Sequence, residues 1–114
     1  MAPIPADPAS ASEDPHARSI DRLEELLTKG VADDTRAEMM FRLAGLYAEL
    51  GDPAAWEKAA KLFRAMATGF PDAERAAEAW FRLAEVLRRL GRDGEADEAM
   101  NTLRTRYPGS PFAR

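Results

Sequence analysis

The same four residues, Phe-Arg-Leu-Ala, occur at positions 41–44 and again at 81–84. In both places a Leu-Gly pair follows, at 50–51 and 90–91, and an aromatic–proline pair comes later, at 70–71 and 107–108. A unit of this length with apolar residues at helical spacing is typical of helical hairpins that stack side by side. The repeat therefore predicts an all-α fold of antiparallel hairpins, arranged as a short solenoid of about five helices.

Apolar periodicity and stop signals place the five helices. We expect them at about 20–29, 35–50, 53–70, 72–90 and 93–106. Ser19 stands where an N-cap belongs, Thr35 and Glu38 have the spacing of a capping box, and Asp52 precedes a proline at the first helical position. The short connections predict that consecutive helices pack antiparallel.

The chain divides into two parts. Residues 1–18 hold four of the eight prolines and little large apolar surface, so we expect a flexible Pro/Ala/Ser-rich tail. Residues 19–114 form the expected helical domain. It consists of a lone helix at 20–29, repeat units at 35–71 and 72–108, and the start of a further unit at 109–114.

Charge and composition exclude several classes of function. The net charge of −4 is opposite to the basic surface that nucleic-acid binding requires. The sequence contains no cysteine, which excludes disulfides and cysteine–zinc sites, and no apolar run long enough to span a membrane. Because no export signal is recognisable, the chain as it stands is expected to be cytoplasmic. It would be periplasmic or in the cell envelope if it were a piece of a longer exported protein.

The sequence also lacks the residues of an active site. His16 is the only histidine, and it lies in the proline-rich segment without a nucleophile or metal ligands at useful spacing. No glycine-rich phosphate-binding loop is present. We therefore expect no enzymatic activity, no cofactor, no metal and no small-molecule substrate.

The second unit carries a more specific pattern. Its residues Trp80, Leu83, Ala84, Leu87, Gly91, Ala96, Met100, Leu103 and Pro108 fall at the spacing of a tetratricopeptide repeat, which this unit resembles. The first unit matches after about three extra residues are allowed between 52 and 56. The turns at 69–76 and 106–113 are similar to those of tetratricopeptide proteins in bacterial cell envelopes. That subclass includes adaptors of the Tol–Pal coordinator and outer-membrane-assembly lipoprotein type.

The resemblance implies a function and a site. In the family, the first helices of successive hairpins line a groove, and the repeats act as adaptors for a peptide or helix of a partner protein. Carried over to this chain, the partner-binding residues would be Phe41, Gly45, Ala48, Glu49, Phe81, Glu85, Arg88 and Arg89. Two alternatives stay open: Phe41 and Phe81 line the groove, or both pack between neighbouring hairpins. Gly45, costly within a helix, indicates close approach of a neighbour or ligand, or simple drift.

The ends of the solenoid give a second hypothesis. Neither the lone first helix nor the fifth helix has a further hairpin beside it in the sequence. A terminal repeat without a polar-faced cap exposes apolar surface, so we expect the fifth helix to do so. The alternative function is then a structural oligomerisation module, a possible homo-oligomer that pairs through its uncapped terminal helices.

Overall fold

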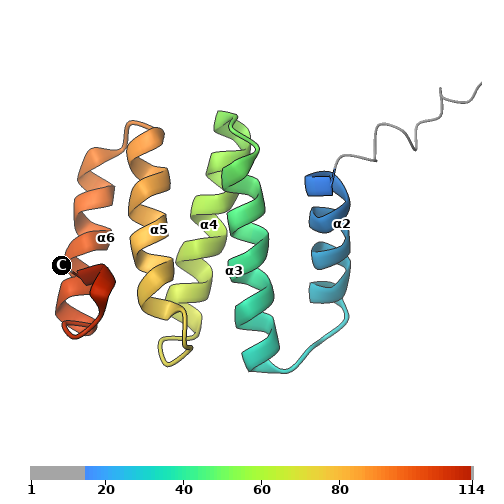
Figure 1. The fold of residues 1–114 in the computed structure, drawn as a ribbon, viewed down its shortest axis with the longest axis horizontal. Coiled ribbons are helices and arrows are strands. Elements are labelled where there is room, and N and C mark those ends of the chain that lie inside the picture. The colour runs from blue at the N-terminus through green and yellow to red at the C-terminus, as the bar shows by residue number, and fades with distance from the viewer. Residues whose placement is uncertain (1–14, 114) are drawn as a thin grey trace, which may run out of the picture.

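The computed structural model describes residues 15–113, which form a row of upright helices (Figure 1). The helices are α2 (Pro15–Thr28), α3 (Asp33–Glu49), α4 (Pro53–Gly69), α5 (Ala76–Arg89), α6 (Asp93–Arg106) and the short 3-10 helix η1 (Pro111–Ala113). This range contains no β-strand. The all-α fold predicted from the repeat is confirmed.

Consecutive helices pack against each other along the whole row. α2 packs on α3, α3 and α4 form one hairpin, α5 and α6 form the next, and α4 joins the two hairpins through its contact with α5. The connections lie alternately at the bottom and the top of the helices and reverse the chain direction each time (Figure 1). The result is the short stack of antiparallel hairpins that the sequence predicts.

Small residues allow the helices of each hairpin to lie close together. Four alanines at the helix crossings have at most 2% of their surface exposed: Ala44 on α3, Ala59 on α4, Ala84 on α5 and Ala96 on α6. Larger residues such as Phe63 fill the space around them. Alanine at a helix crossing permits a short interaxial distance, which explains the small residue at these places in both units.

Two signals at the helix ends act as the sequence predicts. Asp52 caps α4, since its Oδ1 accepts a hydrogen bond from the backbone N–H of Ala55 at 2.9 Å, and Pro53 occupies the first turn. Gly51 and Gly91 follow α3 and α5 with φ of 78° and 79°. Glycine adopts this left-handed conformation without the steric penalty of a side chain, so each residue ends its helix and opens the turn into the second helix of the hairpin.

Three predicted helix starts differ from the structure. α2 begins at Pro15, a residue suited to a first turn, so Ser19 lies inside the helix and does not cap it. α3 begins at Asp33 without a side-chain cap, and the capping box of Thr35 and Glu38 does not form. Two aspartates in its first turn favour that start by opposing the helix dipole. α5 begins at Ala76 because residues 72–75 form turns. Of the expected tail, residues 1–14 lie outside the described residues and 15–18 are helical.

The expectation of an uncovered apolar face on the fifth helix is wrong. The apolar residues of α6 are buried, and its exposed positions are mostly charged or polar: Asp93, Gly94, Glu95, Asp97, Glu98, Asn101, Arg104, Thr105 and Arg106. Leu50 is the one large hydrophobic residue among residues 17–113 that is exposed, with 39% of its surface accessible. α6 therefore has the polar outer face of a capping helix, which removes the reason to expect pairing there. The short helix η1 packs against α5 and α6.

Candidate functional site

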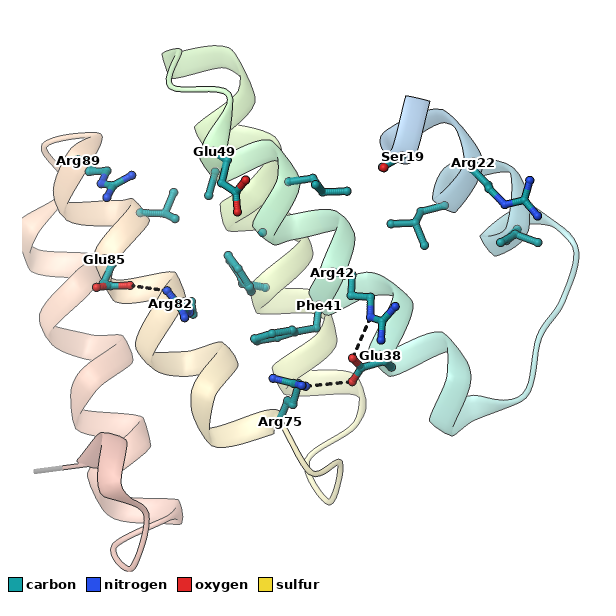
Figure 2. A pocket seen from close by; sticks show the side chains of 17 residues that line it. Ser19, Arg22, Glu38, Phe41, Arg42, Glu49, Arg75, Arg82, Glu85 and Arg89 are labelled. Carbon is teal, nitrogen blue, oxygen red and sulfur yellow. Dashed lines mark hydrogen bonds and ion pairs between the residues drawn. The ribbon is translucent and has the colours of Figure 1, made fainter. Parts of the chain in front are cut away.

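A groove of about 690 Å³ runs along one side of the row (Figure 2). Its walls are α2 on one side and α5 on the other, with α3 between them. The lining residues are Ser19, Arg22, Leu23 and Leu26 of α2, Glu38, Phe41, Arg42, Gly45, Leu46, Ala48 and Glu49 of α3, Phe63 of α4, and Arg75, Arg82, Glu85, Val86 and Arg89 at or within α5. The name "groove" refers to these residues below.

The floor of the groove is apolar. Phe41 and Leu46 of α3, both half-buried, and the buried Val86 of α5 contribute its apolar lining. The Phe41 ring meets the ring of Phe63 edge to face, with centroids 5.6 Å apart, and the Arg75 guanidinium lies 5.1 Å from the Phe41 centroid. These contacts hold Phe41 in one orientation while part of its ring still faces the groove.

Charged side chains surround this floor, and several are paired along the walls. Glu38 accepts from Arg42 of its own helix and from Arg75 of the neighbouring hairpin, at 3.1 Å in each case (Figure 2). Arg82 lies 3.6 Å from Glu85 along α5. The bridge between Glu38 and Arg75 joins the two hairpins at one end of the groove.

Six of the eight predicted partner-binding residues line the groove: Phe41, Gly45, Ala48, Glu49, Glu85 and Arg89. Phe81 lies outside it. Its ring packs against Phe112 of η1, with centroids 5.3 Å apart. Phe81 therefore packs against a neighbouring segment and does not line the groove. Arg88 also lies outside, where it forms an ion pair with Asp97 of α6 at 3.1 Å. Phe41 faces the groove, and its ring packs on Phe63 of its own hairpin.

Gly45 lies in the middle of α3 and faces the groove. A Cβ atom built on it would have no atom within 4 Å, apart from the glycine's chain neighbours and its own helix backbone. Close approach of a neighbouring helix therefore does not explain the glycine. A ligand in the groove and sequence drift remain the two explanations of the original three.

One wall of the groove was not predicted from the sequence. Ser19, Arg22, Leu23 and Leu26 of α2 contribute to it. α2 has no repeated counterpart in the chain, so repeat equivalence could not place it. The residues of α3, α4 and the α5 region that were also not predicted are Glu38, Arg42, Leu46, Phe63, Arg75, Arg82 and Val86. Of these, Arg42 and Arg82 directly follow Phe41 and Phe81, at equivalent positions of the two units.

A hydrogen bond between Tyr47 and Glu24 holds the α2 wall against α3. The Tyr47 hydroxyl donates to the Glu24 carboxylate, and the Lys58 ammonium lies 5.3 Å from the centroid of the Tyr47 ring. Burial, followed by the hydrogen bond and negative charge of Glu24, raises the pKa of Tyr47 to about 12. The protonated phenol is therefore part of the folded structure.

Tyr47 makes the stability of the protein depend on pH in the alkaline range. Its pKa is about 12 in the folded chain and 10.0 ordinarily, so its contribution is complete below pH 10 and is lost between pH 10 and 12. We expect Tyr47→Phe to reduce the loss of unfolding free energy over that range. Urea unfolding at several pH values measures this. Tyr107→Phe is the comparison, because burial also raises the pKa of Tyr107. Equal slopes in wild type and Tyr47→Phe would contradict the assignment.

A second hollow lies at the α3 N-terminus, against the turn between α4 and α5. It holds about 630 Å³ and is lined by the acids Asp33, Asp34, Asp72 and Glu74 among others. No group of three or more His, Asp or Glu side chains within the described part of the chain is arranged to hold a metal ion.

The Tyr107 hydroxyl donates to the carbonyl oxygen of Pro71 at 2.6 Å, so the two aromatic–proline turns are directly connected.

Comparison with known proteins agrees with this architecture. Residues 78–110 match the family model of the tetratricopeptide repeat. No curated protein and no solved structure matches the chain. None of the helices between residues 15 and 113 is both long and apolar enough to cross a membrane. Together with the stacked helical hairpins, the match supports a repeat of the tetratricopeptide type in this chain, and a repeat of this type suggests interaction with other proteins.

Proposed function

We propose that this protein is a non-catalytic adaptor that binds a peptide or helix of a partner protein in the groove. The observation that carries the proposal is the apolar lining of Phe41, Leu46 and Val86, with charged side chains of α2, α3 and α5 around it. A side chain of a partner would cover the apolar surface there, while polar groups around it would stay hydrated. Tetratricopeptide repeats are typically non-catalytic, in agreement with this role.

The finer resemblance, to adaptors of bacterial cell envelopes, is part of the proposal. It is supported by the two aromatic–proline turns, at 70–71 and 107–108. The hydrogen bond from Tyr107 to Pro71 gives the aromatic residue of the second turn a structural role in the stack. Among the partners compatible with the groove, we therefore favour a segment of an envelope protein.

Gly45→Trp tests the groove directly. The new side chain starts in open space and would fill the groove, while loss of a mid-helix glycine favours the helix, so folding is retained. The probe is a phage-displayed library of random peptides of about 16 residues, long enough for about four helical turns. We expect peptides selected on wild type to bind Gly45→Trp at least tenfold more weakly, as measured by fluorescence anisotropy.

Ala65→Trp is the matched control, because Ala65 is exposed on α4 and does not line the groove. It introduces the same side chain into a helix and should leave peptide affinity unchanged. Gly45→Ala, which adds only a methyl group, should retain binding and raise the unfolding free energy by about 1 kcal/mol. Selected peptides that bind wild type and Gly45→Trp equally would refute the proposed site.

A further inference from the structure

We propose that the segment bound in the groove is acidic, with an apolar anchor on the floor and carboxylates that pair with Arg22 and Arg89. This inference rests on the proposed function and specifies the chemistry of the partner. It is carried by two observations: the charge of the groove differs in sign from that of the chain, and the two groove arginines that form no ion pair within the described residues lie on opposite walls.

The groove is basic although the chain is acidic. The whole sequence has 16 basic and 20 acidic residues, for a net charge of −4. The residues that line the groove include five arginines, at 22, 42, 75, 82 and 89, but only three acids, at 38, 49 and 85. Charge complementarity of this kind selects partners of the opposite sign and increases the rate at which they associate.

The acids of the groove are already engaged. Glu38 pairs with both Arg42 and Arg75, and Glu85 pairs with Arg82. Glu49 also has an interaction partner. A lysine or arginine of an incoming segment would therefore have to compete with pairs that exist before binding.

Two arginines are in the opposite situation. Neither Arg22 nor Arg89 forms an ion pair within residues 15–113, and both are exposed. The Arg89 guanidinium lies over the ring of Trp56, 5.9 Å from its centroid, which restricts the side chain and leaves its N–H donors available for a carboxylate. Arg22 extends from α2, and no cation–π contact with a ring of residues 15–113 restricts it.

The two arginines lie on either side of the apolar floor. Figure 2 shows Arg22 on α2 and Arg89 on α5, with α3 between them. A segment that crosses α3 would place its apolar side chain near Phe41 and its flanking residues near the two walls. Acidic flanks would pair with both arginines, and basic flanks would be repelled by both. The floor supplies affinity and the two rim charges supply selectivity.

The composition of the selected peptides provides the first test. Peptides chosen from the random library on wild type should be enriched in Asp and Glu on either side of a large apolar residue. Their affinity should fall as salt concentration rises, because exposed ion pairs are screened. The double variant Arg22→Glu/Arg89→Glu should bind the selected acidic peptides about tenfold more weakly than wild type.

Lys61→Glu/Arg104→Glu is the matched control. Lys61 on α4 and Arg104 on α6 are exposed and outside the groove, and the double change alters net charge by the same amount. Affinity should then change less than about twofold. Circular dichroism confirms equal folding of both double variants before binding is compared.

The outcomes separate this inference from the function on which it rests. Groove-dependent peptides that are neutral or basic, or equal weakening by both double variants, would overturn the acidic partner and leave the adaptor in place. If no selected peptide lost affinity on Gly45→Trp, the groove itself would be rejected as a binding site, and the inference with it.

Discussion

Replacing Phe63 with alanine is expected to lower the free energy of unfolding by about 3–5 kcal/mol. The Phe63 side chain is 1% exposed and belongs to the common core of the hairpins. Its ring also supports Phe41 on the groove floor, with centroids 5.6 Å apart. Loss of the ring leaves a cavity in this core and removes the support of Phe41. For a domain of this size the melting temperature should fall by about 15–30 °C, as measured by circular dichroism.

Leu50→Ala is the comparison for this prediction. Leu50 is 39% exposed in the turn that follows α3, so its truncation should cost less than about 1 kcal/mol. Urea unfolding of both variants should show a large difference in midpoint. A Phe63→Ala protein as stable as Leu50→Ala would contradict the description of Phe63 as a buried core residue.

Replacing Phe112 with alanine is expected to lower the free energy of unfolding by about 2 kcal/mol. η1 folds back on α5 and α6, and the half-buried Phe112 ring covers Phe81 with centroids 5.3 Å apart. Without that ring, apolar surface of α5 becomes exposed to water. The expected cost is below that of Phe63→Ala because Phe112 is only partly buried. Urea unfolding measures the difference.

Pro111→Ala is the control for this segment, since Pro111 is exposed at the start of η1. It should change the unfolding free energy by less than about 1 kcal/mol. The Phe112→Ala variant should also retain peptide binding, because neither Phe81 nor Phe112 lines the groove. A variant that keeps full stability but loses its ligand would place the binding site at Phe81 after all.

Much of the fold could be predicted because repeated residues carry the same packing in both units. Ala44 and Ala84 take equivalent buried places, and Gly51 and Gly91 end equivalent helices. Periodicity also identified α6 with its bounds. These features depend on local spacing and backbone conformation, which the sequence states directly.

The errors come from contacts between distant parts of the chain. Repeat equivalence treats Phe41 and Phe81 alike, but η1 covers Phe81 while α2 and α5 leave Phe41 at the groove. The charged residues of α6 could have predicted its polar outer face, but the end of the repeats favoured the prediction of an exposed apolar face. Helix propensity alone would start α5 at residue 72, but residues 72–75 form turns, so the helix begins later.

The most direct test of the account is a nuclear magnetic resonance titration of the full chain with a peptide selected on wild type. If the groove binds the peptide, chemical-shift changes should concentrate on residues 41–49 of α3 and 82–89 of α5, with a smaller set at 19–26 of α2. The outer face of α6 and the Phe81–Phe112 contact should remain unchanged. Shifts confined to α6 or η1, with the groove residues unaffected, would contradict the adaptor function proposed for the groove.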